Sequence, residues 1–345
     1  MTVDLNLFFP PGASVLALPS WRNPRLVLPA QDLTQRWEQS SFYPAFRSTA
    51  RAYRLFVRLR AAAKLARVRT LHSDGWPLQE FTQDVLPELA NAVILMRASD
   101  PAQRSTVQLW DKKGRVVGYL RYAEKEIARS RLRRERLLLL RLPDGVGPKS
   151  LKYGPLGEGE ALLKTSLLGR PVTVSPPPPG ELVGLLEALI ITDPMPVEVH
   201  PWVRRLRGRM AVDIDSWLEP LASRNWPVAI QHGDLTPWNL LRTPEGGLRL
   251  VDWEYGTLEG FPYIDLTHYI LQTSALIHRL DPLEATREAI DCLRSHGSTS
   301  RDLSEAQALS LVRLAALEAY LKTSEDGQDC KAYLQTWRRA IWSKY

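Results

Sequence analysis

Residue types suited to phosphoryl transfer follow one another in the segment Gln231–Tyr255. Asp234 is followed five positions later by Asn239, and a short predicted hairpin then returns the chain to Asp252. Transfer of a γ-phosphoryl group needs an aligned nucleophile and positive charge around the phosphates. Asp234 is the candidate to accept the proton of the attacking hydroxyl. Asn239 and Asp252 are the candidate ligands of Mg²⁺, a hard cation that prefers oxygen.

The hairpin explains how the second acid would meet the amide. Leu240–Arg242 and Leu248–Val251 are typical of two short strands around the turn Thr-Pro-Glu-Gly-Gly. This hairpin would bring Asp252 back beside Asn239, so that both share one ion. A Gly-Asp pair alone is common in turns, and Asp252 alone is compatible with an ordinary acid at a strand end. The whole combination in this order favours a kinase-type site.

These residues carry a family resemblance. The segment HGDLTPWN, followed by DWE, resembles the signature of the aminoglycoside phosphotransferase and choline kinase-like family. Gly233 stands where protein kinases have Arg, and Trp253-Glu254 stands where they have Phe-Gly. The downstream segment GFPYIDLTHYI, which contains Asp265, is similar to the family's Gly-x-Pro-x-x-Asp-Leu segment. The resemblance covers roughly residues 228–270 strongly and 90–172 weakly, and it does not reach 1–85.

The resemblance implies an α+β, two-lobed, protein-kinase-like fold, with a small antiparallel β-sheet N-lobe and a larger, mainly helical C-lobe. We expect an N-terminal extension with a basic helix over 1–85, a nucleotide-binding N-lobe over 86–172 and a helical C-lobe with the catalytic loop and acceptor site over 173–345. Alternation and turn residues predict a β-meander at the start of the N-lobe. Its strands are Ala92–Met96, Thr106–Trp110 and Val116–Tyr122.

The third of these strands departs from the family pattern. The family has a Lys there that contacts the α- and β-phosphates, and this chain places Arg121 at that position. A predicted helix over Glu126–Leu142 puts Glu135 where the family has the ion-pair partner. A planar guanidinium is not equivalent to an ammonium point charge. Lys125 is the rival candidate if the predicted register of this strand is shifted. The plainest interpretation is that Arg121 and Glu135 are ordinary surface charges.

Further site residues follow from the resemblance. Glu160–Leu168 reads as a strand that leads into the hinge, where backbone groups around Thr165 and Leu167 would meet the adenine of ATP. His232 would hold the catalytic loop by hydrogen bonds, and Asp265 would brace that loop from below. Glu254 would assist the metal or face the substrate.

The other aromatic and histidine residues have simpler interpretations. Trp238 and Trp253 flank the acids and are more often packing groups than stacking platforms. Four further histidines show no metal-ligand spacing with cysteine, so we interpret them as ordinary. They are His200, His268, His278 and His296.

Composition sets broad limits. The 345 residues are 44% hydrophobic and 24% charged, which is typical of a globular protein. Two cysteines, Cys292 and Cys330, argue against a disulfide framework and favour the cytoplasm. The start MTVDLNLFFPPG lacks the pattern of a secretory signal. No apolar run reaches the roughly 18 residues of a membrane span.

The formal charge of +7 is unevenly distributed. A basic helix is expected over 46–69, with Tyr53, Phe56 and Leu59 packing inward. Either its arginines form a solvated face, or they dock on an anionic membrane surface or a lipid-linked substrate, which would make the protein peripheral to a membrane. Arginines that share one face of this helix are Arg47, Arg51, Arg54 and Arg58.

A second basic cluster lies in the predicted helix Glu126–Leu142. We expect its arginines to point outward while its leucines pack inward. Nucleic-acid binding is the weaker alternative, because aromatic residues are not interleaved with these arginines. The cluster consists of Arg129, Arg131, Arg133, Arg134 and Arg136.

Taken together, the residues and the resemblance predict an ATP-dependent, Mg²⁺-dependent kinase that phosphorylates a hydroxyl of a small molecule. A basic chain fits a sugar or glycan-related acceptor better than a cationic aminoglycoside. An aminoglycoside or an amino alcohol such as choline stays open. The alternative function is a pseudokinase that binds nucleotide without turnover, and the substitution at Arg121 motivates it.

Overall fold

The chain divides into two compact units in the computed structural model. Unit 1 consists of Met1–Arg136 and Pro148–Ser166, and unit 2 of Leu137–Gly147 and Leu167–Tyr345. The structure describes residues 3–42, 48–63, 67–96, 104–172, 174, 178–209, 213–295, 303–325, 327, 329 and 332–343.

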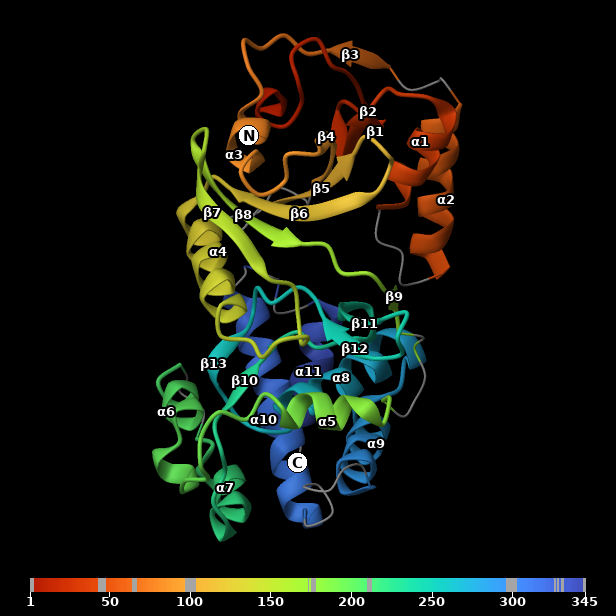
Figure 1. Cartoon of the computed structure of the whole chain (residues 1–345). Coiled ribbons are helices and arrows are strands. Elements are labelled where there is room, and N and C mark those ends of the chain that lie inside the picture. Colours follow the sequence, from red (N-terminus) through yellow and green to blue (C-terminus); the bar gives the residue numbers. More distant parts are fainter. Residues whose placement is uncertain are drawn as a thin grey trace. The chain divides into compact units, whose positions relative to one another are not determined.

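Unit 1 is built on one eight-stranded sheet with the order β3-β1-β2-β4-β5-β6-β8-β7. Every neighbouring pair is antiparallel. The sheet is shown in Figure 1. Its strands are β1 (Ser14–Ser20), β2 (Asn23–Pro29), β3 (Val68–Thr70), β4 (Leu89–Met96), β5 (Ser105–Asp111), β6 (Val116–Ala123), β7 (Ser150–Leu156) and β8 (Gly159–Thr165).

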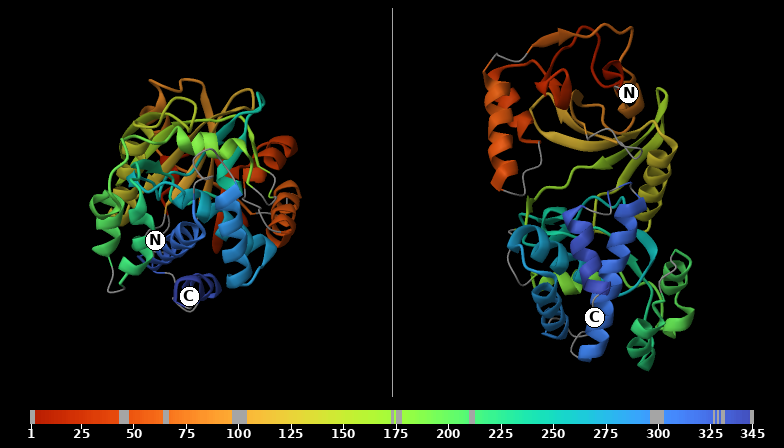
Figure 2. Two further views of the ribbon diagram at one scale, coloured as in Figure 1. Left: turned by 90° about the horizontal axis from the view of Figure 1, so that it is seen from below. Right: turned by 180° about the vertical axis from the view of Figure 1, so that it is seen from behind.

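Alternation along these strands buries apolar side chains on both faces of the sheet. One core contains Leu109, Leu120 and Leu163. The other contains Leu16 and Leu28, against which the helix α2 packs. Figures 1 and 2 show α2 and α4 near opposite ends of the sheet. The helices of unit 1 are α1 (Leu33–Gln39), α2 (Ser48–Ala62), α3 (Pro77–Thr82) and α4 (Glu126–Leu139), with 3₁₀ turns at Leu5–Leu7 and Ser40–Phe42.

The predicted meander corresponds to β4, β5 and β6, which extend the expected ranges by one to three residues at their ends. The expected N-terminal extension differs more. Its strands β1, β2 and β3 belong to the same sheet as β4, because Leu26 and Val27 of β2 pair with Leu95 and Ile94. Residues 1–85 therefore contribute to the sheet of unit 1, and the chain passes into unit 2 after Ser166.

The predicted basic helix is shorter than expected. Helix α2 ends at Ala62, and Val68–Thr70 forms a strand. The expectation that Phe56 and Leu59 pack inward is wrong, because these side chains are 46% and 54% exposed. Tyr53 does pack against the core beneath α2. Arg47, His296 and Cys330 lie outside the described residues.

Unit 2 is mainly helical, with two small sheets of order β10-β13 and β12-β11-β9. Its strands are β9 (Arg170–Pro171), β10 (Ala229–Gln231), β11 (Leu240–Arg242), β12 (Leu248–Leu250) and β13 (Thr257–Gly260). Its helices are α5 (Glu181–Glu187), α6 (Pro201–Arg207), α7 (Asp215–Leu218), α8 (Ile264–Thr273), α9 (Pro282–Ser295), α10 (Glu305–Glu325) and α11 (Tyr333–Ser343), with a π-helical turn at Ser274–His278 and 3₁₀ turns at Val197–Val199, Glu219–Ser223 and Pro237–Asn239.

Helix α10 is the centre of unit 2. Its residues between Gln307 and Ala319 are mostly buried, so the helix is enclosed on several sides by α8, α9 and α11. Figure 2 shows α10 and α11 side by side from behind. A sheet-rich unit followed by a helical unit confirms the predicted α+β, two-lobed class. In the described part of the chain, no helix combines the length and the apolar character needed to cross a membrane.

Candidate active site

The predicted hairpin exists and joins the second acid to the amide. Leu240 pairs with Leu250 between β11 and β12, and the next backbone N–H, that of Val251, donates to the Asn239 carbonyl at 2.9 Å. Asp252 therefore follows immediately after a residue that is hydrogen-bonded to Asn239. This arrangement places the two candidate metal ligands on adjacent backbone of unit 2.

Asp234 is held by residues from two elements. Asn239 Nδ2 donates to the Asp234 carbonyl at 2.9 Å and to Asp234 Oδ2 at 3.2 Å. His268 of α8 lies on the other carboxylate oxygen, with Nε2 at 3.4 Å from Oδ1. The Asp234 side chain is 33% exposed, whereas that of His268 is 9% exposed. The carboxylate is thus oriented by both neighbours and still reaches solvent.

The sequence analysis missed His268 and interpreted it as ordinary. It is 34 residues from Asp234 in the chain, and only the packing of α8 under the loop brings the two together. The available signal was its position three residues after Asp265 in the GFPYIDLTHYI segment. Those residues are one helical turn apart, so they share a face of α8.

The Asp265 side chain supports the loop by binding the loop's backbone N–H groups. Its two carboxylate oxygens accept hydrogen bonds from His232 N at 2.6 Å and Gly233 N at 2.8 Å. Burial raises the pKa of the Asp265 carboxyl, while its hydrogen bonds from the His232 and Gly233 N–H groups oppose that rise. Asp265 is placed to fix the turn that presents Asp234.

Gly233 is required by this turn. Its φ of +77° is left-handed, and a Cβ there would lie 2.3 Å from the Tyr255 carbonyl oxygen and 2.8 Å from Lys322 Nζ. Any side chain would therefore collide with backbone as well as with a lysine. This contact gives a physical reason for glycine at the position where protein kinases have arginine.

His232 acts as a backbone clamp in this structure. Its Nε2 lies 2.8 Å from the Val251 carbonyl oxygen, and its Nδ1 accepts from Asp234 N at 3.3 Å. These partners define a neutral ring with the proton on Nε2. The ring also lies 4.8 Å from the ring of Trp253, which is fully buried and donates from Nε1 to the Leu250 carbonyl. His232 thus ties the catalytic loop to the end of the hairpin.

Asp252 has an unusual backbone conformation. Its φ is +70°, in the left-handed region that non-glycine residues seldom adopt. Such conformations cost about 1–3 kcal/mol and cluster at functional sites. Glu254, two residues on, is 3% exposed. The surroundings of Asp252 must therefore hold its backbone in this strained conformation.

Charged residues from the C-terminal helices surround the same loop. Glu318 of α10 is buried and accepts from Gln231 Nε2 at 2.7 Å and from Trp202 Nε1 at 3.2 Å. Lys322 lies 3.4 Å from Glu318 and 3.4 Å from the Gly233 carbonyl oxygen. Burial would raise the pKa of Glu318, but Lys322 and these hydrogen bonds lower it overall. The carboxylate therefore stays charged and links α10 to the base of the loop.

Helix α11 adds a distant charge. Burial lowers the pKa of Arg338 to about 10, and the negative charge of Asp234 opposes that shift. Arg338 donates to the Ala319 carbonyl at 3.2 Å and to Thr323 Oγ1 at 2.9 Å. The end of the chain thus contributes positive potential at the catalytic loop.

In unit 1, Glu135 of α4 binds two cations. Arg121 Nη1 of β6 lies 3.5 Å from one oxygen, and Lys164 Nζ of β8 lies 2.6 Å from the other. The three side chains are 1–7% exposed. Lys164 is directly opposite Tyr119 in the β6–β8 register, and Tyr119 shares its face of the sheet with Arg121. The sequence analysis named Arg121 and Glu135 but missed Lys164, although the lysine lies in the segment EALLKTSLL predicted as a strand.

The other residues predicted to bind the nucleotide, Lys125, Thr165 and Leu167, are not part of the Glu135 cluster. Lys125 directly precedes α4, so Glu135 is ten residues, or about 15 Å, further along that helix. Thr165 is the last residue of β8, and its Oγ1 accepts from Lys149 N at 3.0 Å. Leu167 is the first residue of unit 2 after β8. Lys164, rather than Lys125, is the lysine that the fold brings to Glu135.

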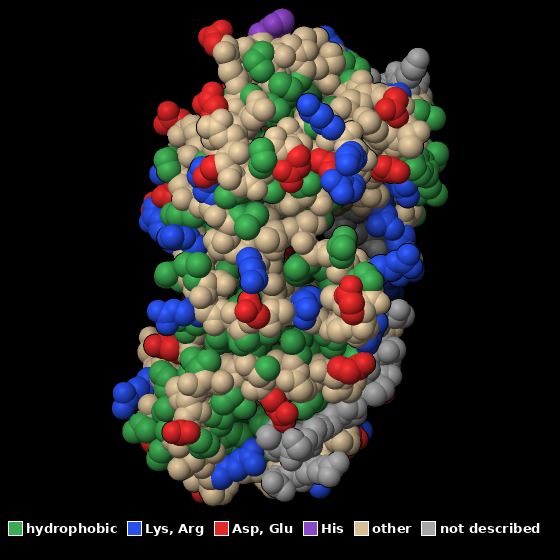
Figure 3. All heavy atoms as spheres, viewed as in Figure 1, with side chains coloured by type: hydrophobic (Ala, Val, Ile, Leu, Met, Phe, Trp, Pro, Cys, Tyr) green, Lys and Arg blue, Asp and Glu red, His purple; other side chains and the backbone are tan. Residues whose placement is uncertain are grey.

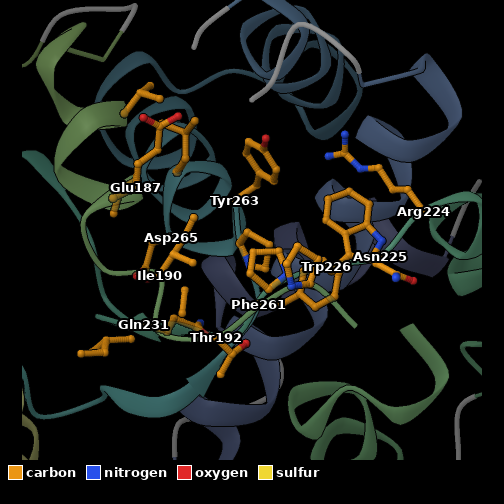
Figure 4. A pocket seen from close by; sticks show the side chains of 18 residues that line it. Glu187, Ile190, Thr192, Arg224, Asn225, Trp226, Gln231, Phe261, Tyr263 and Asp265 are labelled. Carbon is orange, nitrogen blue, oxygen red and sulfur yellow. The ribbon is translucent and has the colours of Figure 1, made fainter. Parts of the chain in front are cut away.

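A cavity of about 440 Å³ lies elsewhere in unit 2. It is bounded by α5, by the segment that ends in β10 and by the start of α8, and Figure 4 shows Trp226 and Phe261 next to each other on its wall. Asp265 reaches it, but Asp234, Asn239 and Asp252 are not among its lining residues. The cavity is therefore not lined by these three candidate residues.

The residues of the catalytic loop fit a hard cation. Asn239 uses its amide nitrogen on Asp234, which turns its carbonyl oxygen away from that carboxylate. Asp252, which follows the residue bonded to the Asn239 carbonyl, carries a carboxylate, and oxygen donors are what Mg²⁺ prefers. Within the described ranges, no three His, Cys, Asp or Glu side chains gather as a metal site.

The comparisons with known proteins agree with the resemblance seen in the sequence. Residues 170–290 match the model of the phosphotransferase enzyme family. This range contains Asp234, Asn239 and Asp252. Among the curated proteins, none matches the chain.

Solved structures also resemble this fold. A thermostable mutant of aminoglycoside phosphotransferase APH(4)-Ia is 15% identical, with a TM-score of 0.46, over 77% of this chain and 98% of that one. A Plasmodium vivax ethanolamine kinase is 10% identical, with a TM-score of 0.46, over 73% and 81%. A putative fructosamine-3-kinase from Haemophilus somnus is 11% identical, with a TM-score of 0.41, over 76% and 96%. Because these TM-scores are below 0.5, we base the function on the residues of the matched segment.

Proposed function

We propose that the protein is an ATP-dependent kinase that phosphorylates a hydroxyl group of a small molecule. The observation that carries this proposal is the arrangement around Asp234, which Asn239 and His268 orient while a third of its side chain stays exposed. A carboxylate that accepts the proton of the attacking hydroxyl in a phosphotransferase needs both a fixed direction and access to the acceptor.

The proposed step is a direct transfer. The acceptor oxygen attacks the γ-phosphorus, the bond from that phosphorus to the β–γ bridging oxygen breaks, and ADP leaves. Asp234 accepts the hydroxyl proton through the oxygen that faces the acceptor. His268 and Asn239 keep the carboxylate in one orientation, which lowers the entropy cost of aligning the reacting groups.

Asn239 and Asp252 would hold Mg²⁺ in this proposal, with Glu254 as a further candidate on the same segment. When bound, the ion neutralises charge that develops on the phosphate oxygens. His232 and Val251 hold the backbone on which both ligands stand, since one hydrogen bond joins Val251 to each of His232 and Asn239. Asp252 adopts a positive φ, a strained backbone conformation of the kind that clusters at functional sites.

In unit 1 we propose that Lys164 supplies the ammonium that contacts nucleotide phosphate, with Arg121 as the second cation. A lysine is a compact charge suited to phosphate, whereas arginine favours planar bidentate partners. Glu135 holds both cations by its two oxygens. Backbone groups near Thr165 and Leu167 are proposed to meet the adenine.

For the acceptor we propose a sugar or glycan-related hydroxyl. The chain carries a formal charge of +7, which disfavours a polycationic aminoglycoside by simple repulsion. Aminoglycosides and amino alcohols such as choline are the alternatives to be compared with it.

The test is an acceptor panel incubated with ATP and Mg²⁺. Neutral and acidic sugars, amino alcohols and aminoglycosides are each assayed by mass spectrometry for a gain of one phosphate, and ADP release is measured in parallel. We expect gain with one sugar class, dependent on Mg²⁺. The competing proposal, a pseudokinase, predicts Mg²⁺-dependent stabilisation by ATP without phosphate gain on any acceptor and without ADP release.

A further inference from the structure

Helix α2 of unit 1 turns apolar side chains toward solvent. Leu55, Phe56 and Leu59 are 51%, 46% and 54% exposed, whereas Val57 and Ala61 are buried against the sheet. With about 100° of rotation per residue, the exposed trio covers the side of the helix opposite Val57 and Ala61. A helix on the surface of a globular protein normally presents polar residues there.

Arginines border this apolar strip, and the helix carries no acid between Ser48 and Ala62. By the same helical rotation, Arg51 and Arg58 lie along one side of the strip and Arg60 lies along the other, while Arg54 lies further round, near the direction of Ala61. Arg58 is fixed over the ring of Trp37 at 4.0 Å and donates to its carbonyl at 3.3 Å.

The arginines of α2 are close enough to affect one another. Burial and the charge of Arg54 lower the pKa of Arg58. At the right-hand edge of Figure 3, where α2 runs, hydrophobic side chains lie near Lys and Arg side chains. Positive charge is therefore concentrated around an exposed apolar strip.

We propose that α2 docks on an anionic phospholipid surface, an interaction that is independent of the proposed kinase activity. Leu55, Phe56 and Leu59 would enter the boundary between headgroups and acyl chains. Arg51 and Arg60 would meet the lipid phosphates on the two sides of the strip. An apolar strip with basic borders is the pattern by which helices lie in a membrane interface.

Charge and chemistry favour this occupant over two others. A second copy that docks through its own α2 would bring two acid-free basic helices together, which like charges oppose. A nucleic acid would place its phosphates against Leu55 and Leu59, and Phe56 is a single ring rather than the row of rings on which successive bases stack. An anionic lipid surface offers acyl chains to the apolar strip and phosphates to the arginines.

The test is co-sedimentation of the full chain with vesicles of phosphatidylcholine alone and of phosphatidylcholine with phosphatidylglycerol. We compare wild type with the double variant Leu55→Gln/Leu59→Gln. The matched control is Leu137→Gln/Leu140→Gln, because those leucines are 58% and 57% exposed but lie outside the strip. Far-UV circular dichroism checks that each variant is folded.

We expect wild type and control to bind the anionic vesicles, with binding that weakens as salt is raised, and the Leu55/Leu59 variant to bind at least about tenfold more weakly. Equal binding of that variant and wild type would overturn the proposal, as would absence of binding to anionic vesicles. So would a wild-type dimer in light scattering that the Leu55/Leu59 variant dissociates, since the strip would then be a contact between copies. Free inorganic phosphate, added at the concentration of lipid phosphate in the vesicles, separates lipid binding from phosphate binding. If it competes with the vesicles at that concentration, the result counts against a lipid surface.

Discussion

At the scale of single residues, the chemistry depends on how the Asp234 carboxylate is aimed. Asn239 holds one oxygen and His268 the other, at 3.2 Å and 3.4 Å. Neither residue needs to touch the acceptor for this effect. His268 is therefore a positioning residue, and its contribution differs from that of a general base.

Replacing His268 tests this role. We expect His268→Phe to lower kcat roughly tenfold, because a hydrogen bond to a charged group is worth about 1.5–3 kcal/mol, reduced here by solvent access to Asp234. The KM for ATP should stay the same. His268→Gln, which keeps an N–H donor, should recover part of the loss.

The control is His278→Phe, ten residues further along the same helical run and about 15 Å away. Steady-state kinetics separate the outcomes. A wild-type kcat in His268→Phe would mean that His268 only fills space and does not orient Asp234.

Lys164 gives a second prediction at this scale. Lys164→Met should raise the KM for ATP about tenfold or more, because an ammonium next to phosphate is lost. Arg121 would still pair with Glu135, so the buried carboxylate would not be left without a cation. An unchanged KM together with a raised KM in Arg121→Met would assign the phosphate contact to Arg121 instead.

At the scale of elements, short caps and clamps position the longer helices. His200 is an example, because it is fully buried and links two segments of unit 2. Its Nδ1 accepts from Trp202 N at the start of α6, and its Nε2 lies 3.1 Å from the Pro227 carbonyl oxygen. Both bonds together require the neutral ring.

This capping predicts a pH dependence of stability. Burial lowers the pKa of His200 below 6.5, while its bond to Pro227 opposes that shift. Below about pH 6.5 the unfolded chain binds a proton that the folded chain resists, so the free energy of unfolding falls by at most about 1.4 kcal/mol per pH unit. Above that pH the contribution is complete.

His200→Asn is the matched variant, because asparagine can still cap the helix but does not titrate. Urea unfolding is measured for both proteins from pH 7.5 to 5.5. The stability advantage of wild type should shrink as the pH falls. Parallel curves for the two proteins would show that His200 does not carry this dependence.

Local sequence was enough to predict the elements around the chemistry. The hairpin β11–β12, the strands β4 to β6 and helix α4 were predicted because turn residues, alternation and helical periodicity lie within each segment. The contacts of Lys164 and His268 were not predicted, because they join residues 29 and 34 positions apart. Such pairs depend on strand register and helix packing, which local patterns do not specify.

Helix α2 shows that local patterns also leave open which face of a helix is buried. Periodicity identified a helix with a basic face, and hydrophobic character suggested that Phe56 and Leu59 face a core. Packing instead buried Val57 and Ala61. Which face of an amphipathic segment is covered is decided by the neighbours that the fold supplies.

At the scale of the whole molecule, the two units divide the proposed work. Unit 1 carries the cation cluster at Glu135 and the outward face of α2, and unit 2 carries the catalytic loop with its supports from α8, α10 and α11. Within unit 2, buried charges converge on one loop: Asp265, Glu318 and Lys322 all reach the turn at Gly233 or the residues next to it. The fold of this unit is therefore organised around the presentation of Asp234.

The most direct measurement compares wild type with Asp234→Asn, using the acceptor found in the panel and saturating ATP and Mg²⁺. Asparagine keeps the shape of the side chain but cannot take the proton, so phosphate transfer should fall by about 10²–10⁴-fold. The thermal stabilisation by ATP and Mg²⁺ should persist, which shows that the fold and nucleotide binding are intact. Transfer by Asp234→Asn at the wild-type rate would contradict the account.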